Sequence, residues 1–119
     1  MVITLMNYRL KKDGFGISIC HDGKSAIQYL NSSLPDVVIV DIMMPKVSGF
    51  EVLRYLRNIL KSNIPVIVLS SINDEDTLIE AFELGANEFV TKPFNHEEIV
   101  IRIKKLLLHS KNFAGDTTL

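Results

Sequence analysis

Two short apolar runs restrict the fold of this chain more than any other feature. The runs "DVVIVD" (36–41) and "PVIVLS" (65–70) are rich in β-branched residues and hold no polar residue between their ends. A continuous apolar run suits a strand that is covered on both faces, as strands of a parallel sheet are. The stretches "GISIC" (16–20) and "NEFVTK" (87–92) predict two further strands.

Helical patterns separate these strands. Residues 24–32, 49–61, 73–85 and 95–109 place apolar side chains at separations of three and four, which is typical of amphipathic helices. The third of these helices is predicted to begin with Asn73 as its N-cap and to stop at Gly85. The fourth has Asn95 as N-cap and Glu98 in the capping-box position. Strands that alternate with helices predict an α/β fold with a doubly wound parallel sheet.

Composition excludes several classes of function. The chain has 119 residues, of which 47% are hydrophobic and 23% charged, and its net charge is −1. Without an excess of basic residues, we expect no binding of nucleic acid or of anionic membranes by this chain itself. No apolar run reaches the length of a membrane span, and a cytoplasmic location is expected. The one cysteine, Cys20, allows no intramolecular disulfide and no cysteine cluster for zinc.

Three polar residues end three of the predicted strands. Asp41 follows "VVIV", Ser70 follows "VIVL", and Lys92 follows "EFVT". Because the carboxyl ends of parallel strands meet at one edge of the sheet, these side chains are expected to converge there. An exposed carboxylate can act as a nucleophile toward a phosphoryl group, while an ammonium, a hydroxyl and a divalent cation would offset the added negative charge.

The chain resembles the receiver domain of two-component response regulators, which has the flavodoxin-like (CheY-like) fold. The motifs "PDVVIVDIMMPKVSGFEVLR", "PVIVLSS" and "LGANEFVTKPF" carry the resemblance, in order and at the spacing of that family. The resemblance extends from about residue 5 to about residue 108. It predicts a receiver domain over residues 1–110, followed by a flexible C-terminal tail over 111–119.

The resemblance also implies roles for single residues. Asp41 would be the phosphoacceptor, Ser70 the hydroxyl that moves toward the phosphoryl group, and Lys92 the cation that pairs with it. Phe89 matches the aromatic residue that changes rotamer on activation. The cofactor would be Mg2+, with Asp41 and the backbone carbonyl of Met43 as its ligands.

The backbone is also expected to carry special features near the site. The resemblance implies that the Lys92–Pro93 peptide bond is cis. Pro45 and Gly49 would bend the chain around the site before the next helix begins.

At its N-terminus the chain departs from the family pattern. Residues 1–13 align with the first helix of the family, which would end at Gly14, so the first strand and its acidic pair have no counterpart. Asp13 and Asp22 are the nearest upstream acids, and neither is placed to replace that pair. Affinity for Mg2+ should therefore fall. Since the first strand normally lies in the middle of the sheet, the expected result is a sheet of four strands or a swapped dimer.

These observations lead to one main function and one alternative. The main function is a receiver that takes a phosphoryl group from a sensor histidine kinase or phosphotransfer protein onto Asp41 and switches a surface that binds a downstream effector. The alternative is a degenerate receiver that serves, without phosphorylation, as an interaction or homodimerisation module. We expect no enzyme: haloacid-type phosphatases need a second acid where Met43 stands, and no flavodoxin-type phosphate loop is visible.

Overall fold

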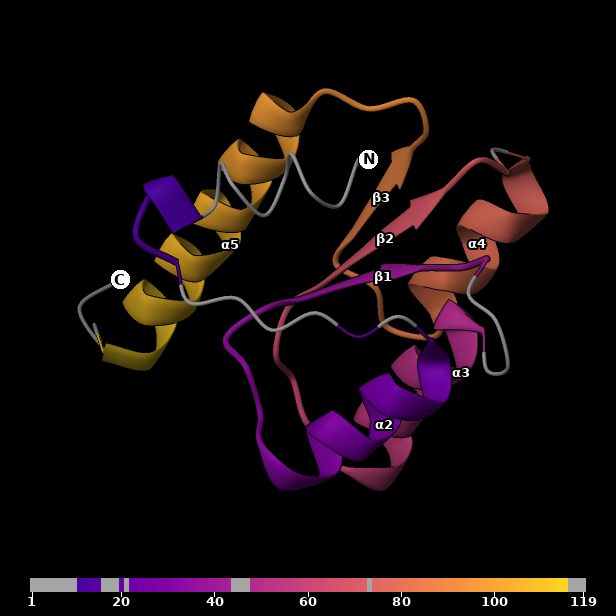
Figure 1. The fold of residues 1–119 in the computed structure, drawn as a ribbon, viewed down its shortest axis with the longest axis horizontal. Helices are drawn as coiled ribbons and strands as arrows, with labels where there is room; N and C mark the ends of the chain where they lie inside the picture. Colours follow the sequence, from indigo (N-terminus) through magenta and orange to yellow (C-terminus); the bar gives the residue numbers. More distant parts are fainter. Residues whose placement is uncertain (1–10, 16–19, 21, 44–47, 73, 116–119) are drawn as a thin grey trace. The chain divides into compact units, whose positions relative to one another are not determined.

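The computed structural model describes residues 11–15, 20, 22–43, 48–72 and 74–115 (Figure 1). The chain divides into two compact units, which are described separately. One unit consists of Cys20–Pro93, and the other of Met1–Ile19 together with Phe94–Leu119.

A parallel sheet forms the centre of the Cys20–Pro93 unit. Its strands are β1 (Val38–Asp41), β2 (Val66–Ser70) and β3 (Glu88–Thr91), in the order β1-β2-β3 (Figure 1). All five residues of β2 are buried, as the continuous apolar run predicts for a strand covered on both faces. The three strands confirm the predictions for 36–41, 65–70 and 87–92. The fourth predicted strand, 16–20, falls mostly on 16–19, outside the described residues.

Three of the four predicted helices belong to the same unit. They are α2 (Gly23–Ser32), α3 (Gly49–Arg54), which continues as the π-helix η1 (Tyr55–Ile59), and α4 (Glu75–Glu83). The wider turn of η1 closes with a hydrogen bond from Leu60 N to Tyr55 O at 3.0 Å, a departure from regular helix that the apolar spacing does not reveal.

The predicted start of α4 was wrong by one residue. The N-cap is Asp74, whose carboxylate accepts a hydrogen bond from Thr77 N at 2.7 Å, and not Asn73, which lies outside the described residues. Both residue types are good N-caps, so sequence preference alone does not separate them. The predicted end at Gly85 is confirmed, since Gly85 has a φ of +105°, the left-handed conformation usual after a helix.

The core of this unit lies between the helices and the sheet. Leu53 and Leu56 are fully buried, and Val66 and Val68 of the central strand lie in the same cluster. Phe89 of β3 packs against this cluster and is only partly buried. Burial of such side chains is worth about 1.5–3 kcal/mol each, so the apolar faces of these helices hold the strands in place.

The other unit contains α5 (His96–Gly115). Asn95 caps it, because its side-chain oxygen accepts from Glu97 N at 2.8 Å, and Glu98 forms an ion pair with Arg102 at 3.4 Å. The helix extends beyond the predicted end at residue 109 and continues to Gly115, into the segment predicted as a tail.

Residues 11–12 of the same unit are helical, and Gly14, with a φ of +91°, follows them. The predicted helix end at Gly14 is therefore confirmed, whereas residues 1–10 lie outside the described part of the chain. Among the described residues, no helix has both the length and the apolar composition needed to cross a bilayer.

Candidate functional site

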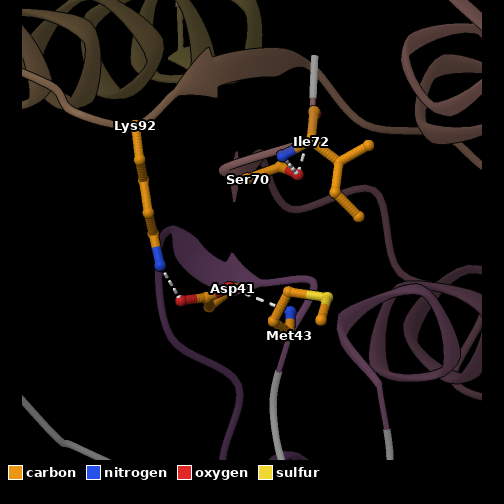
Figure 2. Close-up of polar contacts among 5 residues, drawn as sticks. All are labelled: Asp41, Met43, Ser70, Ile72 and Lys92. Carbon is orange, nitrogen blue, oxygen red and sulfur yellow. Dashed lines mark hydrogen bonds and ion pairs between the residues drawn. The ribbon is translucent and has the colours of Figure 1, made fainter. Parts of the chain in front are cut away.

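Asp41 ends β1 with a carboxylate held between two donors (Figure 2). One oxygen, Oδ2, forms an ion pair with Lys92 Nζ, and the other, Oδ1, accepts from Met43 N at 2.9 Å. The side chains of Lys92 and Asp41 are 34% and 31% exposed, so both are accessible from solvent. The prediction that these two residues converge is confirmed.

The sheet itself positions Lys92. It directly follows β3, and its backbone N donates to Ser70 O at 2.8 Å, which continues the pairing of β2 with β3. The Lys92–Pro93 peptide bond is cis, as the resemblance implies. The Lys92 side chain therefore starts at the end of β3, which β2 separates from β1 in the sheet, and extends across the end of β2 to Asp41 (Figure 2).

Ser70 lies at the same edge but makes different contacts. Its side chain is fully buried, and its hydroxyl donates to Ile72 O and accepts from Ile72 N, both at 2.9 Å (Figure 2). The hydroxyl thus closes a tight turn after β2, a local bond that serine commonly forms. Of the predicted trio, Asp41 and Lys92 are in contact, while Ser70 is bonded within its own turn.

Gly49 lies against the backbone of the candidate acceptor. A Cβ atom at this position would be 2.6 Å from Asp41 O and 2.9 Å from Asp41 C. The Gly49 N–H donates to Ile42 O at 3.3 Å. The start of α3 can therefore approach the end of β1 only because residue 49 has no side chain. Pro45, the other residue predicted to bend the chain here, lies outside the described residues.

Met43 contributes a donor that the sequence did not suggest. Its backbone N–H binds the Asp41 carboxylate, while its side chain is 63% exposed. An aspartate side chain that accepts from the backbone N–H two residues later closes a common type of turn. An aspartate at the end of a strand is therefore the sequence signal that could have indicated this contact. Phe89, the predicted switch residue, lies in β3 next to Val68 of β2 in the sheet register.

The described residues fit a Mg2+ site poorly. Magnesium is usually held by one or two carboxylates with water and substrate phosphate oxygens completing six ligands. Asp41 supplies one carboxylate, and that carboxylate already contacts the Lys92 ammonium. In the described part of the chain, no group of three histidine, cysteine, aspartate or glutamate residues could hold a metal.

The two upstream acids are engaged elsewhere. Asp13 pairs with Lys104 at 3.3 Å, and Asp22 caps α2 by accepting from Ser25 N at 2.7 Å. The prediction that neither replaces the acidic pair agrees with these contacts.

Comparisons with known proteins agree with this geometry. Residues 1–104 match the family of the response regulator receiver domain. The chain is 33% identical over 110 residues to the alkaline phosphatase synthesis transcriptional regulatory protein PhoP of Bacillus subtilis, a match that covers 92% of this chain and 45% of PhoP. The chain thus spans less than half the length of that relative.

Solved structures show the same fold. The receiver domain of the Francisella response regulator 1452 is 31% identical with a TM-score of 0.86, over 92% of this chain and 90% of that one. A BeF3-activated DrrB receiver domain is 28% identical with a TM-score of 0.80, over 90% of this chain and 88% of that one. The predicted flavodoxin-like, CheY-like fold is confirmed. This chain belongs to the receiver domain family of two-component response regulators.

Proposed function

We propose that this chain is a phosphorylation-switched receiver that accepts a phosphoryl group on Asp41. The observation that carries the proposal is the Asp41 carboxylate, which ends β1, stays partly exposed and lies between the Lys92 ammonium and the Met43 N–H. The phosphoryl group would come from a sensor histidine kinase or a phosphotransfer protein.

The chemistry follows from the two oxygens of Asp41. One carboxylate oxygen attacks phosphorus, the bond from phosphorus to the donor atom breaks, and an acyl phosphate forms. The modified side chain carries more negative charge than the carboxylate. Lys92, already in contact with Asp41, supports this charge through a charge-assisted hydrogen bond.

The switch would involve Ser70 and Phe89. To reach a phosphoryl group, the Ser70 hydroxyl must leave both of its bonds to Ile72, which releases the turn after β2. Phe89, only partly buried, would then change rotamer toward the space that Ser70 leaves. Such a two-state change could alter a surface that binds a downstream effector.

Receiver domains of this family generally bind Mg2+. In this chain, Asp41 and the Met43 carbonyl are the donors that we propose for the metal. With one carboxylate among them, we expect the affinity to be weak.

The test is intact-mass spectrometry after incubation with acetyl phosphate and Mg2+. We expect one phosphoryl adduct on the wild-type chain and none on Asp41→Asn. Asp36→Asn is the matched control, because Asp36 is an exposed acid that precedes the amino end of the same strand, and it should keep the adduct. The BeF3-activated form of the DrrB receiver suggests beryllofluoride as a second probe of Asp41.

A folded chain that gains no adduct would contradict phosphorylation on Asp41. That result would favour the alternative, a degenerate receiver that acts as an interaction or dimerisation module.

A further inference from the structure

The acids that precede Asp41 in the sequence are not placed to join it as metal ligands. Asp13 and Asp22 are the acids that precede Asp36 in the sequence. One is paired with Lys104 and the other caps α2, so recruiting either to a metal would break an existing contact. Asp36 precedes β1 at its amino end, about 16 Å from Asp41 if the chain between them is extended.

The charge at Asp41 is already balanced by the protein. The carboxylate carries one negative charge and the Lys92 ammonium in contact with it carries one positive charge. A divalent cation that approached this pair would be attracted by Asp41 and repelled by Lys92 at nearly the same distance. The remaining oxygen, Oδ1, accepts from Met43 N, so both oxygens of the carboxylate are bound to donors.

We propose that Lys92, and not a divalent cation, supplies the main positive charge at Asp41 in this chain, so that the metal binds weakly and phosphoryl loading depends more on Lys92 than on Mg2+. The second half of this inference, on phosphoryl loading, rests on the proposed function. Its first half, weak binding of a divalent cation by the unmodified chain, stands on the contacts of Asp41 alone.

The loading step needs no further reactant. An Asp41 carboxylate oxygen attacks the phosphorus of acetyl phosphate, the bond between phosphorus and the acetate oxygen breaks, and acetate leaves with the electron pair. The charge on the side chain changes from about −1 to about −2 at neutral pH. Lys92, which offsets the single charge before the reaction, is placed to offset part of the added charge after it.

The first experiment is a titration of the isotope-labelled chain with Mn2+ alone, followed by paramagnetic broadening of backbone amide signals. We expect no saturable broadening centred on Asp41 and Met43 below about 1 mM Mn2+. Lys92→Met removes the competing ammonium, so Mn2+ binding near Asp41 should tighten by about threefold or more. Lys24→Met, an exposed lysine at the start of α2, is the control and should behave as wild type.

The second experiment measures loading by acetyl phosphate with excess Mg2+ and with EDTA. The rate should differ by less than about threefold between the two conditions, and should fall by about tenfold or more in Lys92→Met. Lys24→Met should load at the wild-type rate.

Two results would overturn the inference. The first is localised Mn2+ binding at Asp41 and Met43 well below 1 mM in the wild type, and the second is loading that rises more than tenfold with Mg2+. If no variant gains an adduct under any condition, the proposed function fails, and the Mn2+ titration still decides whether Lys92 excludes the metal.

Discussion

The two ends of the parallel sheet each hold a cation, but the two cations face different partners. At the carboxyl ends of the strands, Lys92 contacts the partly exposed carboxylate of Asp41. At the amino ends of β2 and β3, Arg57 of η1 donates hydrogen bonds to uncharged oxygens. A cation that faces one exposed anion is available for chemistry, whereas a cation whose donors all face fixed neutral acceptors holds the fold together.

The contacts of Arg57 define what we call the arginine clasp. The guanidinium donates five hydrogen bonds: two to Gly85 O (3.1 and 2.8 Å) and one each to Ser62 O (2.9 Å), Ile64 O (2.8 Å) and Asn87 Oδ1 (3.0 Å). Burial lowers the pKa of Arg57, yet an arginine stays protonated in a protein. The clasp joins η1 and the loop that follows it to residues 85–87, which are distant in sequence.

Loss of the clasp should produce the largest effect on stability. Arg57→Met keeps much of the apolar stem but leaves several carbonyls without their donor, so the free energy of unfolding should fall by about 3 kcal/mol. Urea denaturation followed by circular dichroism measures it. Arg54→Met, at an exposed arginine one turn earlier, should change stability by less than about 0.5 kcal/mol.

The proposed phosphorylation of Asp41 sharpens this comparison. We call the carboxyl ends of the strands, with Asp41 and Lys92, the chemical end of the sheet, and the amino ends, with Arg57, the structural end. If Arg57→Met, under conditions in which it remains folded, gained the phosphoryl group as slowly as Lys92→Met, this distinction would be wrong. Equal losses of stability in the Arg57 and Arg54 variants would contradict the clasp itself.

A substitution at Gly85, at the same end of the sheet, tests the clasp by changing the backbone rather than the arginine. Its φ is +105°, and a Cβ atom there would be 2.8 Å from Arg57 Nε. Gly14 has a similar φ of +91° with nothing within 4 Å of the added Cβ, so it isolates the conformational strain. We expect Gly85→Ala to cost about 2 kcal/mol and Gly14→Ala about 1 kcal/mol in thermal or urea unfolding.

A double variant separates the two causes at Gly85. In the Arg57→Met background, the side chain that the new Cβ meets is replaced, so Gly85→Ala should cost less than it does in the wild type. Strict additivity would show that strain alone, and not the clasp, explains the cost.

Gly49 is the corresponding glycine at the chemical end. The added Cβ of Gly49→Ala would meet the backbone of Asp41 at 2.6 Å, and backbone yields less easily than the end of a flexible side chain. We expect a loss of about 1 kcal/mol in stability and a marked slowing of Asp41 loading, measured by intact mass. Normal loading in this variant would contradict the role of the close approach in positioning Asp41.

The chemical end could be predicted from the sequence better than the structural end. Asp41 and Lys92 stand at the ends of clear strand patterns, and parallel strands bring such ends together whatever the details. Arg57, by contrast, lies in a helical stripe where most arginines face solvent, and its acceptors are mostly backbone carbonyls, which carry no signal in a sequence. The π-helix that contains Arg57 was missed for the same reason.

The hydrogen-bond partners of the Ser70 hydroxyl could not be predicted from the sequence either. Its position at the end of β2 was predicted correctly, but a serine hydroxyl can bind its own turn or a neighbour across the sheet edge. The local bonds to Ile72 are decided by the backbone of the turn, which the residue types alone do not specify.

Helix α4 connects the two ends, and its start offers the smallest of these tests. Asp74 follows β2 at the chemical end, and Gly85, after the last turn, contributes its carbonyl to the arginine clasp. Hydrogen bonds with Thr77 lower the pKa of Asp74 below its usual value. A carboxyl whose pKa is lower in the folded state stabilises the fold above the unfolded pKa of about 3.9, and this contribution disappears as the pH falls through the folded pKa.

Asp74→Ala should therefore lower the urea midpoint slightly at neutral pH, and the difference from wild type should shrink progressively below about pH 4. Asp76→Ala, an exposed acid in the first turn of the same helix, is the control that lacks the cap. A difference that stayed constant from neutral to acid pH would mean that the Asp74 side chain contributes through something other than its ionised cap. Since Asp74 lies far along the helix from the clasp, its loss should add to that of Arg57→Met without coupling, because distant sites act independently.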